Sequence, residues 1–212
     1  MTAYAEGLDP EELAFQRLYG PVLPSTPADC AELMDGFGHP WWIAGGWAVE
    51  AFTGVARPHE DVDLAIFGRD VAALRAQVGG RYHLWSNHGG TLRPISDRFP
   101  EPLEGGHQIW LREHALAPWR YDVVLSEDRE GRWIFRRDPS LDFELAEVTW
   151  VAPDGIRYIT PEMALAYKAA LHRPKDDADL AAVLPLLDDP RRGWLRDTVA
   201  RLYPGHDWLT RI

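Results

Sequence analysis

Two aspartates, Asp61 and Asp63, lie at the start of an apolar segment, in the stretch RPHEDVDLAIF over residues 57–67. In an extended chain alternate side chains share a face, so both carboxylates point one way while Val62 and Leu64 point the other. Like charges held this close repel, and one takes up a proton unless a cation lies between them. Mg²⁺ prefers oxygen ligands and keeps room for substrate phosphates, so the pair is a candidate magnesium site. A solvated strand end is the alternative for an isolated Asp-x-Asp pair.

A glycine pair, Gly45-Gly46, precedes these aspartates, between a short apolar strand and a predicted helix. Because glycines have no side chains, backbone N–H groups can approach a phosphate at the helix N-terminus, where the helix dipole favours an anion. A glycine pair in such a turn can also be purely structural, and no P-loop or GxGxxG pattern is present. The order strand, glycine pair, helix, Asp-x-Asp favours phosphate chemistry over both structural alternatives.

The string WIAGGWAVEAFTGVARPHEDVD, from Trp42 to Asp63, resembles the polymerase-β-like nucleotidyltransferase superfamily. In that superfamily a glycine pair is followed, roughly a dozen residues later, by a D-h-D-h pattern in which h is apolar. Fourteen residues separate Gly46 from Asp61 here. This spacing, with its Arg-x-His element, is similar to the aminoglycoside and lincosamide adenylyltransferase branch. The resemblance covers about residues 42–66.

The resemblance implies a Mg²⁺-dependent enzyme that transfers AMP from ATP to a hydroxyl of a small molecule and releases pyrophosphate. It implies that Asp61 and Asp63 hold the metal, with two ions expected. It also implies a third carboxylate on a neighbouring strand, which completes the metal site and can take the proton of the attacking hydroxyl. Asp122, in the apolar segment 119–125, is the best candidate for this third carboxylate. The alternative interpretation is that Asp122 only faces solvent. The residues expected to bind the nucleotide are Gly45, Gly46, Arg57, His59 and Lys168.

Lys168 is one of only two lysines in the chain, the other being Lys175. It lies on a predicted helix whose Leu165 is expected to be buried. A buried lysine requires an anion, and a triphosphate would supply one. The surrounding segment, residues 160–179, is similar to a PE…K…RPKD..D segment of bacterial relatives. We interpret its RPKD cluster as a structural lock between two helices, where the acids also complement the helix dipole.

The elements that must position these residues indicate an α+β fold, with strands and helices first and helices later. Predicted helices cover residues 9–19, 26–37, 47–53, 70–77, 160–172, 174–187 and 191–203. Predicted strands cover residues 41–44, 61–67, 81–86, 107–112, 120–126, 132–136 and 155–159. We predict a nucleotidyltransferase α/β unit with a mixed, helix-flanked sheet over residues 1–155, and a C-terminal helical unit over residues 156–212. The Pro- and Gly-rich segment 94–106 is predicted to be a mobile loop.

The charge and composition of the chain indicate which partners and which cellular location to expect. A net charge of −11 repels phosphate backbones and disfavours nucleic acid. No apolar run is long enough for a membrane span, and the N-terminal sequence lacks the basic start and apolar core of a signal peptide. The single cysteine, Cys30, cannot form an internal disulfide, so we expect a cytoplasmic protein. The oligomeric state is left open.

The acidic charge favours a cationic acceptor, with an aminoglycoside-like amino sugar ahead of a lincosamide, since a carboxylate-lined cleft concentrates polycations. Five loop acids near predicted strand ends are expected to contribute: Glu101, Glu104, Glu113, Glu127 and Asp128.

Two rival functions are a nucleotide-binding module that has lost catalysis and an antitoxin-like enzyme that adenylylates a protein. Three candidate carboxylates argue against the first, and the helices after residue 160 argue against the second.

Overall fold

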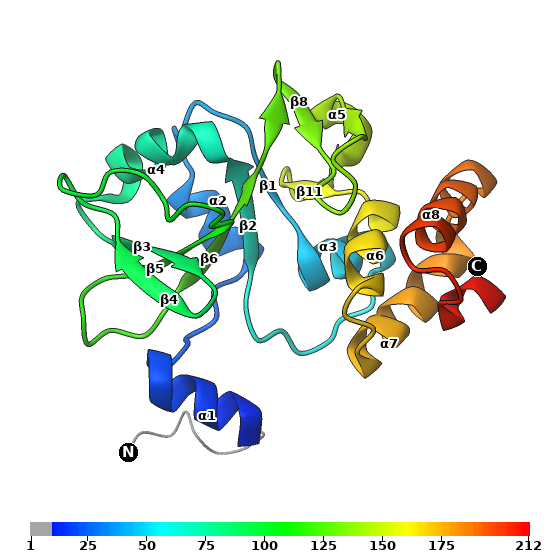
Figure 1. Cartoon of the computed structure of the whole chain (residues 1–212), viewed down its shortest axis with the longest axis horizontal. Coiled ribbons are helices and arrows are strands. Elements are labelled where there is room, and N and C mark those ends of the chain that lie inside the picture. The colour runs from blue at the N-terminus through cyan, green and yellow to red at the C-terminus, as the bar shows by residue number, and fades with distance from the viewer. Residues whose placement is uncertain (1–9) are drawn as a thin grey trace.

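The computed structural model describes residues 10–212 and has the predicted α+β architecture (Figure 1). Its main sheet has eight strands in the order β10-β11-β1-β2-β6-β5-β3-β4, and a second sheet has the order β7-β8-β9. The strands of the main sheet are β1 (Trp41–Ile43), β2 (Asp63–Phe67), β3 (His83–His88), β4 (Thr91–Pro94), β5 (Gln108–Arg112), β6 (Tyr121–Ser126), β10 (Thr149–Val151) and β11 (Arg157–Ile159). Those of the small sheet are β7 (Asp128–Arg129), β8 (Arg132–Ile134) and β9 (Asp142–Phe143).

The helices divide into an N-terminal and a C-terminal group. The first group is α1 (Pro10–Tyr19), α2 (Pro27–Leu33), α3 (Gly45–Thr53), α4 (Val71–Val78) and α5 (Leu145–Val148). The second is α6 (Pro161–Ala169), α7 (Pro174–Val183) and α8 (Asp189–Leu202). Helices α6 and α7 pack on α3, and α8 packs on α6, so this group stands at one side of the sheet (Figure 1).

The main sheet is mixed, and its centre carries the segments of chemical interest. Strand β2 runs parallel to β6 and antiparallel to β1, while β6 runs antiparallel to β5. Burial alternates along β5 and β6: Ile109 and Val123 enter the hydrophobic core, whereas Gln108 and Asp122 are only half-buried. This alternation with a period of two leaves polar side chains on one face of the central strands.

Local signals in the sequence explain where several helices begin and end. Thr26 and Asp29 form a reciprocal capping box at the start of α2, which has a proline in its first turn. Helix α2 ends at Leu33 instead of residue 37, before a turn in which Gly36 adopts a φ of 73°. Gly54 closes α3 in the left-handed conformation.

Other boundaries differ from those predicted. Helix α3 begins at Gly45, not at residue 47, so both glycines lie in its first turn. Strand β2 begins at Asp63, which places Asp61 in the loop before it. Strands β4, β7, β9 and β10 and helix α5 were not predicted, and the hairpin partner of β10 is β11.

The predicted unit boundary near residue 155 falls just before β11. This strand lies inside the main sheet beside β1, and the helical residues begin at Pro161. The division of the chain into two units therefore stays a prediction. Asp9, the first residue of the predicted 9–19 helix, lies outside the described residues. Within residues 10–212, no helix is both long and apolar enough to cross a membrane.

Candidate active site

The three predicted metal ligands lie together at one end of two neighbouring strands. Asp63 on β2 is directly opposite Asp122 on β6, because the two strands are parallel and in register there. Asp61 comes two residues before Asp63. Carboxylate oxygens of all three lie within 4.8 Å of one another.

The cluster strongly disfavours three simultaneous negative charges. Burial raises the pKa of Asp63 to about 7, and the neighbouring Asp61 adds to the effect. Burial, with Asp63 and Asp61 nearby, holds the pKa of Asp122 well above its usual range. Burial also raises the pKa of Asp61, although the charge of Lys175 opposes the rise. A cation between the three groups would relieve this repulsion.

The residues present fit a magnesium ion. Oδ2 of Asp122 accepts a hydrogen bond of 2.8 Å from Nε2 of Gln108. Its Oδ1 is buried and has no partner with hydrogen-bond geometry among residues 10–212, although the indole of Trp110 lies near enough to act against the rise in the pKa of Asp122. A buried oxygen without a partner is costly, and a bound cation would satisfy it. The donor set consists of carboxylate oxygens only, which is the chemistry that Mg²⁺ prefers.

Both glycines are required by close approach at the N-terminus of α3. Gly45 has a φ of 64°, and a Cβ there would collide with Oδ2 of Asp63. A Cβ at Gly46 would collide with the guanidinium of Arg57. The backbone N–H of Ala44 donates to the carbonyl of Asp63 at 2.8 Å. The helix N-terminus predicted to bind phosphate therefore lies directly against the carboxylate cluster.

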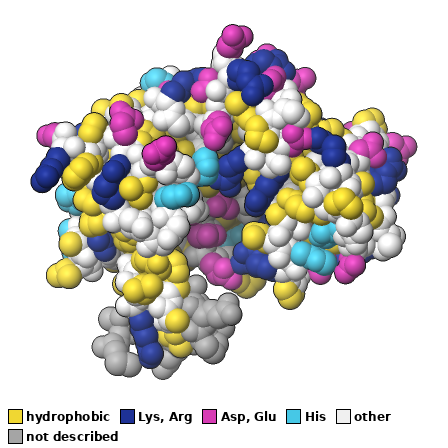
Figure 2. All heavy atoms as spheres, in the orientation of Figure 1, with side chains coloured by type: hydrophobic (Ala, Val, Ile, Leu, Met, Phe, Trp, Pro, Cys, Tyr) yellow, Lys and Arg dark blue, Asp and Glu magenta, His cyan; other side chains and the backbone are white. Residues whose placement is uncertain are grey.

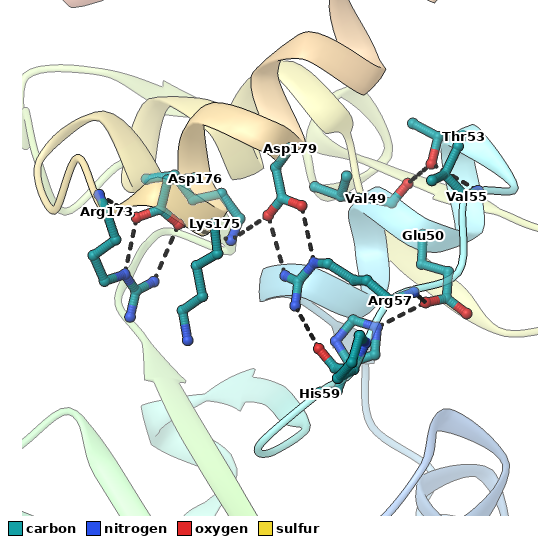
Figure 3. Close-up of polar contacts among 12 residues, drawn as sticks. Val49, Glu50, Thr53, Val55, Arg57, His59, Arg173, Lys175, Asp176 and Asp179 are labelled. Carbon is teal, nitrogen blue, oxygen red and sulfur yellow. Dashed lines mark hydrogen bonds and ion pairs between the residues drawn. The ribbon is translucent and has the colours of Figure 1, made fainter. Parts of the chain in front are cut away.

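Arg57 lines the site, but its guanidinium is engaged by other groups (Figure 3). Nε and Nη2 donate to the two carboxylate oxygens of Asp179 on α7, at 3.0 and 3.1 Å. Nη1 donates to the carbonyl of Pro58 at 2.9 Å, and the backbone N–H donates to Glu50 at 3.1 Å. These contacts fix the loop that leads into Asp61, and nucleotide binding by Arg57 remains a prediction.

His59 is held in a similar way. Its Nε2 lies 2.8 Å from Oε2 of Glu50, and its ring stacks on Trp47 with centroids 3.9 Å apart. The indole N–H of Trp47 in turn donates to the carbonyl of Asp61 at 3.1 Å. Helix α3 thus holds the loop before β2 through two side chains, Glu50 and Trp47. Nucleotide binding by His59 likewise remains a prediction.

Lys168 is buried, and its anion comes from within the chain. Its ammonium lies 3.2 Å from Oδ1 of Asp176 and 2.9 Å from Oδ2 of Asp179. Arg173 also donates to Asp176, from Nε at 2.9 Å (Figure 3). Burial acts to raise the pKa of Asp176, but hydrogen bonds from Arg173 and the charge of Lys168 outweigh it and lower that pKa. This geometry matches the predicted lock between α6 and α7. Because Asp176 and Asp179 compensate the buried charge of Lys168, its burial does not require a bound phosphate.

A cleft of about 660 Å³ contains these groups. Acidic side chains gather in the hollow between the sheet and the C-terminal helices, with Lys and Arg side chains beside them (Figure 2). The basic lining residues are Arg57, Arg136, Arg137, Lys168, Arg173 and Lys175. The acidic lining residues are Glu60, Asp61, Asp63, Asp122 and Glu127. The cleft therefore has charges of both signs.

The expectation that loop acids line the cleft is met by one residue of five. Glu127 lines it, whereas Glu101, Glu104, Glu113 and Asp128 do not. Asp128 instead forms an ion pair with Arg69. Position in a loop near a strand end does not determine which way an acid faces, so the sequence alone misplaced these four.

Sequence reasoning also missed three residues that support the cluster: Trp47, Glu50 and Gln108. Gln108 offered one signal, since it is a polar residue at an alternating position of a strand otherwise rich in apolar side chains. Its hydrogen bond to Asp122 depends on the register between β5 and β6, which places Gln108 opposite Val124 and which no local pattern encodes.

Comparison with known proteins gives a family model for part of the sequence and several solved structures with a similar fold. The family model described as aminoglycoside-2''-adenylyltransferase matches residues 28–79. The solution structure of the antibiotic-resistance factor ANT(2'')-Ia is similar over 91% of this chain and 94% of that chain, with 18% identity and a TM-score of 0.53. The crystal structure of ANT(2'')-Ia in complex with adenylyl-2''-tobramycin covers 80% of this chain and 92% of that chain, with 16% identity and a TM-score of 0.51.

A weaker likeness is to the crystal structure of the lincosamide antibiotic adenylyltransferase LnuA bound to lincomycin. It covers 83% of this chain and 96% of that chain, with 14% identity and a TM-score of 0.48. No curated protein matches the chain in sequence. The chain shares its fold with the two ANT(2'')-Ia structures. The resemblance predicted from the sequence is confirmed by the family model over residues 28–79, and the fold is consistent with it.

Proposed function

We propose that this protein transfers AMP from ATP, in a Mg²⁺-dependent reaction, to a hydroxyl of a small-molecule antibiotic in the cytoplasm. One observation carries the proposal: Asp63 and Asp122 lie opposite each other on parallel strands, with Asp61 beside them and the α3 N-terminus against them. The enzyme class agrees with the family model and with the fold.

Asp61, Asp63 and Asp122 would hold the metal, and we propose two ions. When bound, Mg²⁺ neutralises charge on the phosphate oxygens and helps to orient the attacking and leaving oxygens. The backbone N–H groups at the start of α3 would bind triphosphate oxygens, since neither Gly45 nor Gly46 has a side chain to block their approach. Arg173 and Lys175, at the start of α7, lie along the same cleft and supply positive charge for the phosphates.

The acceptor hydroxyl attacks the α-phosphorus in line. A new bond forms between this oxygen and phosphorus, and the bond from phosphorus to the pyrophosphate oxygen breaks. The hydroxyl proton passes to the carboxylate of Asp122, which lies beside Asp61 and Asp63 in the proposed metal site. Gln108 holds Oδ2 of the same carboxylate and so fixes the orientation of the base.

We infer that the acceptor is cationic and of the aminoglycoside type, with a lincosamide as the second choice. The net charge of −11 attracts cations over a distance. Glu127 lines the cleft and can face an ammonium group, as can Glu60, which also forms an ion pair with Lys175 at 2.7 Å. The family model and the tobramycin-derived ligand of the similar structure point to the same chemical class.

The test is a product screen. The protein is incubated with MgATP and a panel of aminoglycosides, lincosamides and neutral sugars at low and high salt, and products are identified by mass spectrometry. Adenylylated aminoglycosides, formed faster at low salt, support the proposal. Products from neutral sugars alone, or rates indifferent to salt, contradict the cationic acceptor. Nucleotide binding without any product identifies a binding module, and AMP on a partner protein identifies the protein-modifying alternative.

A further inference from the structure

A second, smaller cavity adjoins the carboxylate cluster. Its volume is about 150 Å³, and it shares Glu60, Asp61 and Asp122 with the large cleft. Four aromatic residues line its other walls, among them Phe15 on α1 and Trp110 on β5, and the remaining lining residues are Val22, Pro24, Val62 and Arg120. These aromatic residues take no part in the proposed transfer of AMP.

The register of the sheet explains why aromatic rings meet the carboxylates. Asp63 on β2 pairs with Asp122 on β6, Asp122 pairs with Trp110 on β5, and Trp110 pairs with Trp85 on β3. Side chains of directly paired residues stand on the same face of a sheet, about 5 Å apart. Trp110 is therefore the side chain that follows Asp122 across the polar face. It is half-buried, so part of its surface is open to a ligand.

Helix α1 supplies an adjacent wall. The ring of Phe15 meets Trp110 edge-on, with centroids 5.6 Å apart. The hydroxyl of Tyr19 donates to the carbonyl of Gly90 at 3.1 Å and so ties the end of α1 to the β3–β4 turn. Figure 1 shows α1 outside the sheet and apart from helices α6–α8.

The two cavities differ in their phosphate-binding features. Gly45, Gly46, Arg173 and Lys175 line the large cleft, and none of them lines the small cavity. In-line displacement requires the attacking hydroxyl and the leaving pyrophosphate to lie on opposite sides of the α-phosphorus. The strand order β1-β2-β6-β5 places the glycine pair on one side of the carboxylates and Trp110 on the other. The small cavity is thus on the side from which the acceptor must approach.

We propose that this cavity binds the acceptor ring that carries the attacking hydroxyl, and that this ring is a saturated sugar ring packed on Trp110. The inference rests on the proposed function and names the part of the acceptor that the protein recognises. An aromatic surface suits the apolar C–H face of a sugar, and the adjacent Asp122 receives the hydroxyl proton. Pockets for drug-sized ligands measure roughly 300–1,000 Å³, so this one takes a single ring while the remainder of the acceptor extends into the cleft.

The test compares Phe15→Ala and Trp110→Leu with Leu18→Ala, a control on the same helix whose side chain is 73% exposed. Binding of tobramycin and of lincomycin is measured by calorimetry in the presence of Mg²⁺ and a non-hydrolysable ATP analogue. We expect Phe15→Ala and Trp110→Leu to weaken binding of the acceptor by about tenfold. Leu18→Ala should bind it as the wild type does, and all three variants should bind the nucleotide with unchanged affinity.

The outcomes separate the two proposals. Failure of the wild type to bind the magnesium–nucleotide complex overturns the proposed function itself. Normal nucleotide binding, with acceptor affinity unchanged in Phe15→Ala and Trp110→Leu, overturns only the aromatic subsite. Binding of neither tobramycin nor lincomycin by the wild type also overturns the subsite, together with the proposed acceptor class. Unchanged nucleotide binding shows that a variant is folded. If Trp110→Leu does not fold, the acceptor affinity of Phe15→Ala still decides the test.

Discussion

Arg57 and Asp179 are joined by two hydrogen bonds although 122 positions separate them in the sequence. Arg57 lies in the loop that leads into Asp61, and Asp179 lies on α7. Because Asp179 also holds the ammonium of Lys168 at 2.9 Å, one carboxylate ties this loop to both α6 and α7. The C-terminal helices therefore contribute to the position of the carboxylate cluster without supplying a ligand to it.

Replacing Asp179 should destabilise the fold. Asp179 is only 3% exposed, and Asp179→Asn leaves Arg57 and Lys168 with one anionic partner fewer. Removing one member of a buried ion pair costs about 3–5 kcal/mol, because the remaining charges stay desolvated. Urea denaturation should show a loss of this size in the free energy of unfolding. The matched control is Asp197→Asn, which breaks a surface pair with Arg196 and should change stability by less than about 1 kcal/mol. Equal effects of the two changes would contradict the proposed tie.

Gly46→Ala should lower nucleotidyl transfer without unfolding the protein. The new Cβ displaces the guanidinium of Arg57 and crowds His59, so the loop before Asp61 shifts. Misplacement of reacting groups by about 1 Å can cost about 100-fold in rate, and we expect a loss of that order in kcat/KM. Gly80→Ala is the control, since nothing lies within 4 Å of a Cβ there. Equal activity of both variants would refute the close-approach argument.

Gly45→Ala adds backbone strain to its collision with Asp63, because Gly45 has a φ of 64°. Left-handed backbone costs an ordinary residue about 1–2 kcal/mol. Gly155→Ala introduces the same kind of strain, at a φ of 82°, but in open space. Thermal melts should show destabilisation by both changes, while only Gly45→Ala should abolish the stabilisation of the protein by Mg²⁺. Loss of the Mg²⁺ effect in Gly155→Ala as well would show that the collision is not the cause.

The raised pKa of Asp63 predicts how stability depends on pH when metal is absent. Its folded-state pKa of about 7 lies above the ordinary value of 3.8, so the folded protein holds a proton that the unfolded chain releases. This group's contribution to stability is therefore present below about pH 4 and is lost as the pH rises to about 7. In EDTA, Asp63→Asn should melt above the wild type at pH 8, and the difference should shrink towards pH 4. Each 1 kcal/mol corresponds to about 2–4 °C for a chain of this size.

Magnesium should reverse that order. At pH 8 the ion binds the folded wild type and raises its melting temperature by mass action, whereas Asp63→Asn lacks a ligand and should respond less. A variant that melts below the wild type in EDTA at pH 8 would contradict mutual repulsion within the cluster. An equal response of both proteins to Mg²⁺ would contradict the role of Asp63 as a ligand.

Local sequence signals predicted much of the fold and the centre of the site. The capping residue Thr26, the closing Gly54 and the apolar segments around Asp63 and Asp122 have local causes, so the corresponding elements were found. The glycine pair and Asp-x-Asp carry their chemistry in their spacing. These features depend on residues close together in the chain.

Features that depend on strand pairing or on distant partners could not be predicted in the same way. The register between strands places Asp63 directly opposite Asp122 and brings Gln108 within hydrogen-bond distance of Asp122. It also places Trp110 next to Asp122 on the same face of the sheet. The partners of Lys168 illustrate the same limit. Its burial correctly required an anion, but the sequence did not show that the aspartates of α7 provide it.

The most direct test of the central claim follows the label of ATP. Wild type and Asp63→Asn are incubated in parallel with α-labelled and γ-labelled ATP, Mg²⁺ and the acceptor that gives the strongest product. If the carboxylate cluster catalyses nucleotidyl transfer, the acceptor gains the α-label only, γ-label leaves as pyrophosphate, and Asp63→Asn forms little or no product although it remains folded. Transfer of the γ-label to the acceptor, or undiminished α-label transfer by Asp63→Asn, would contradict the account.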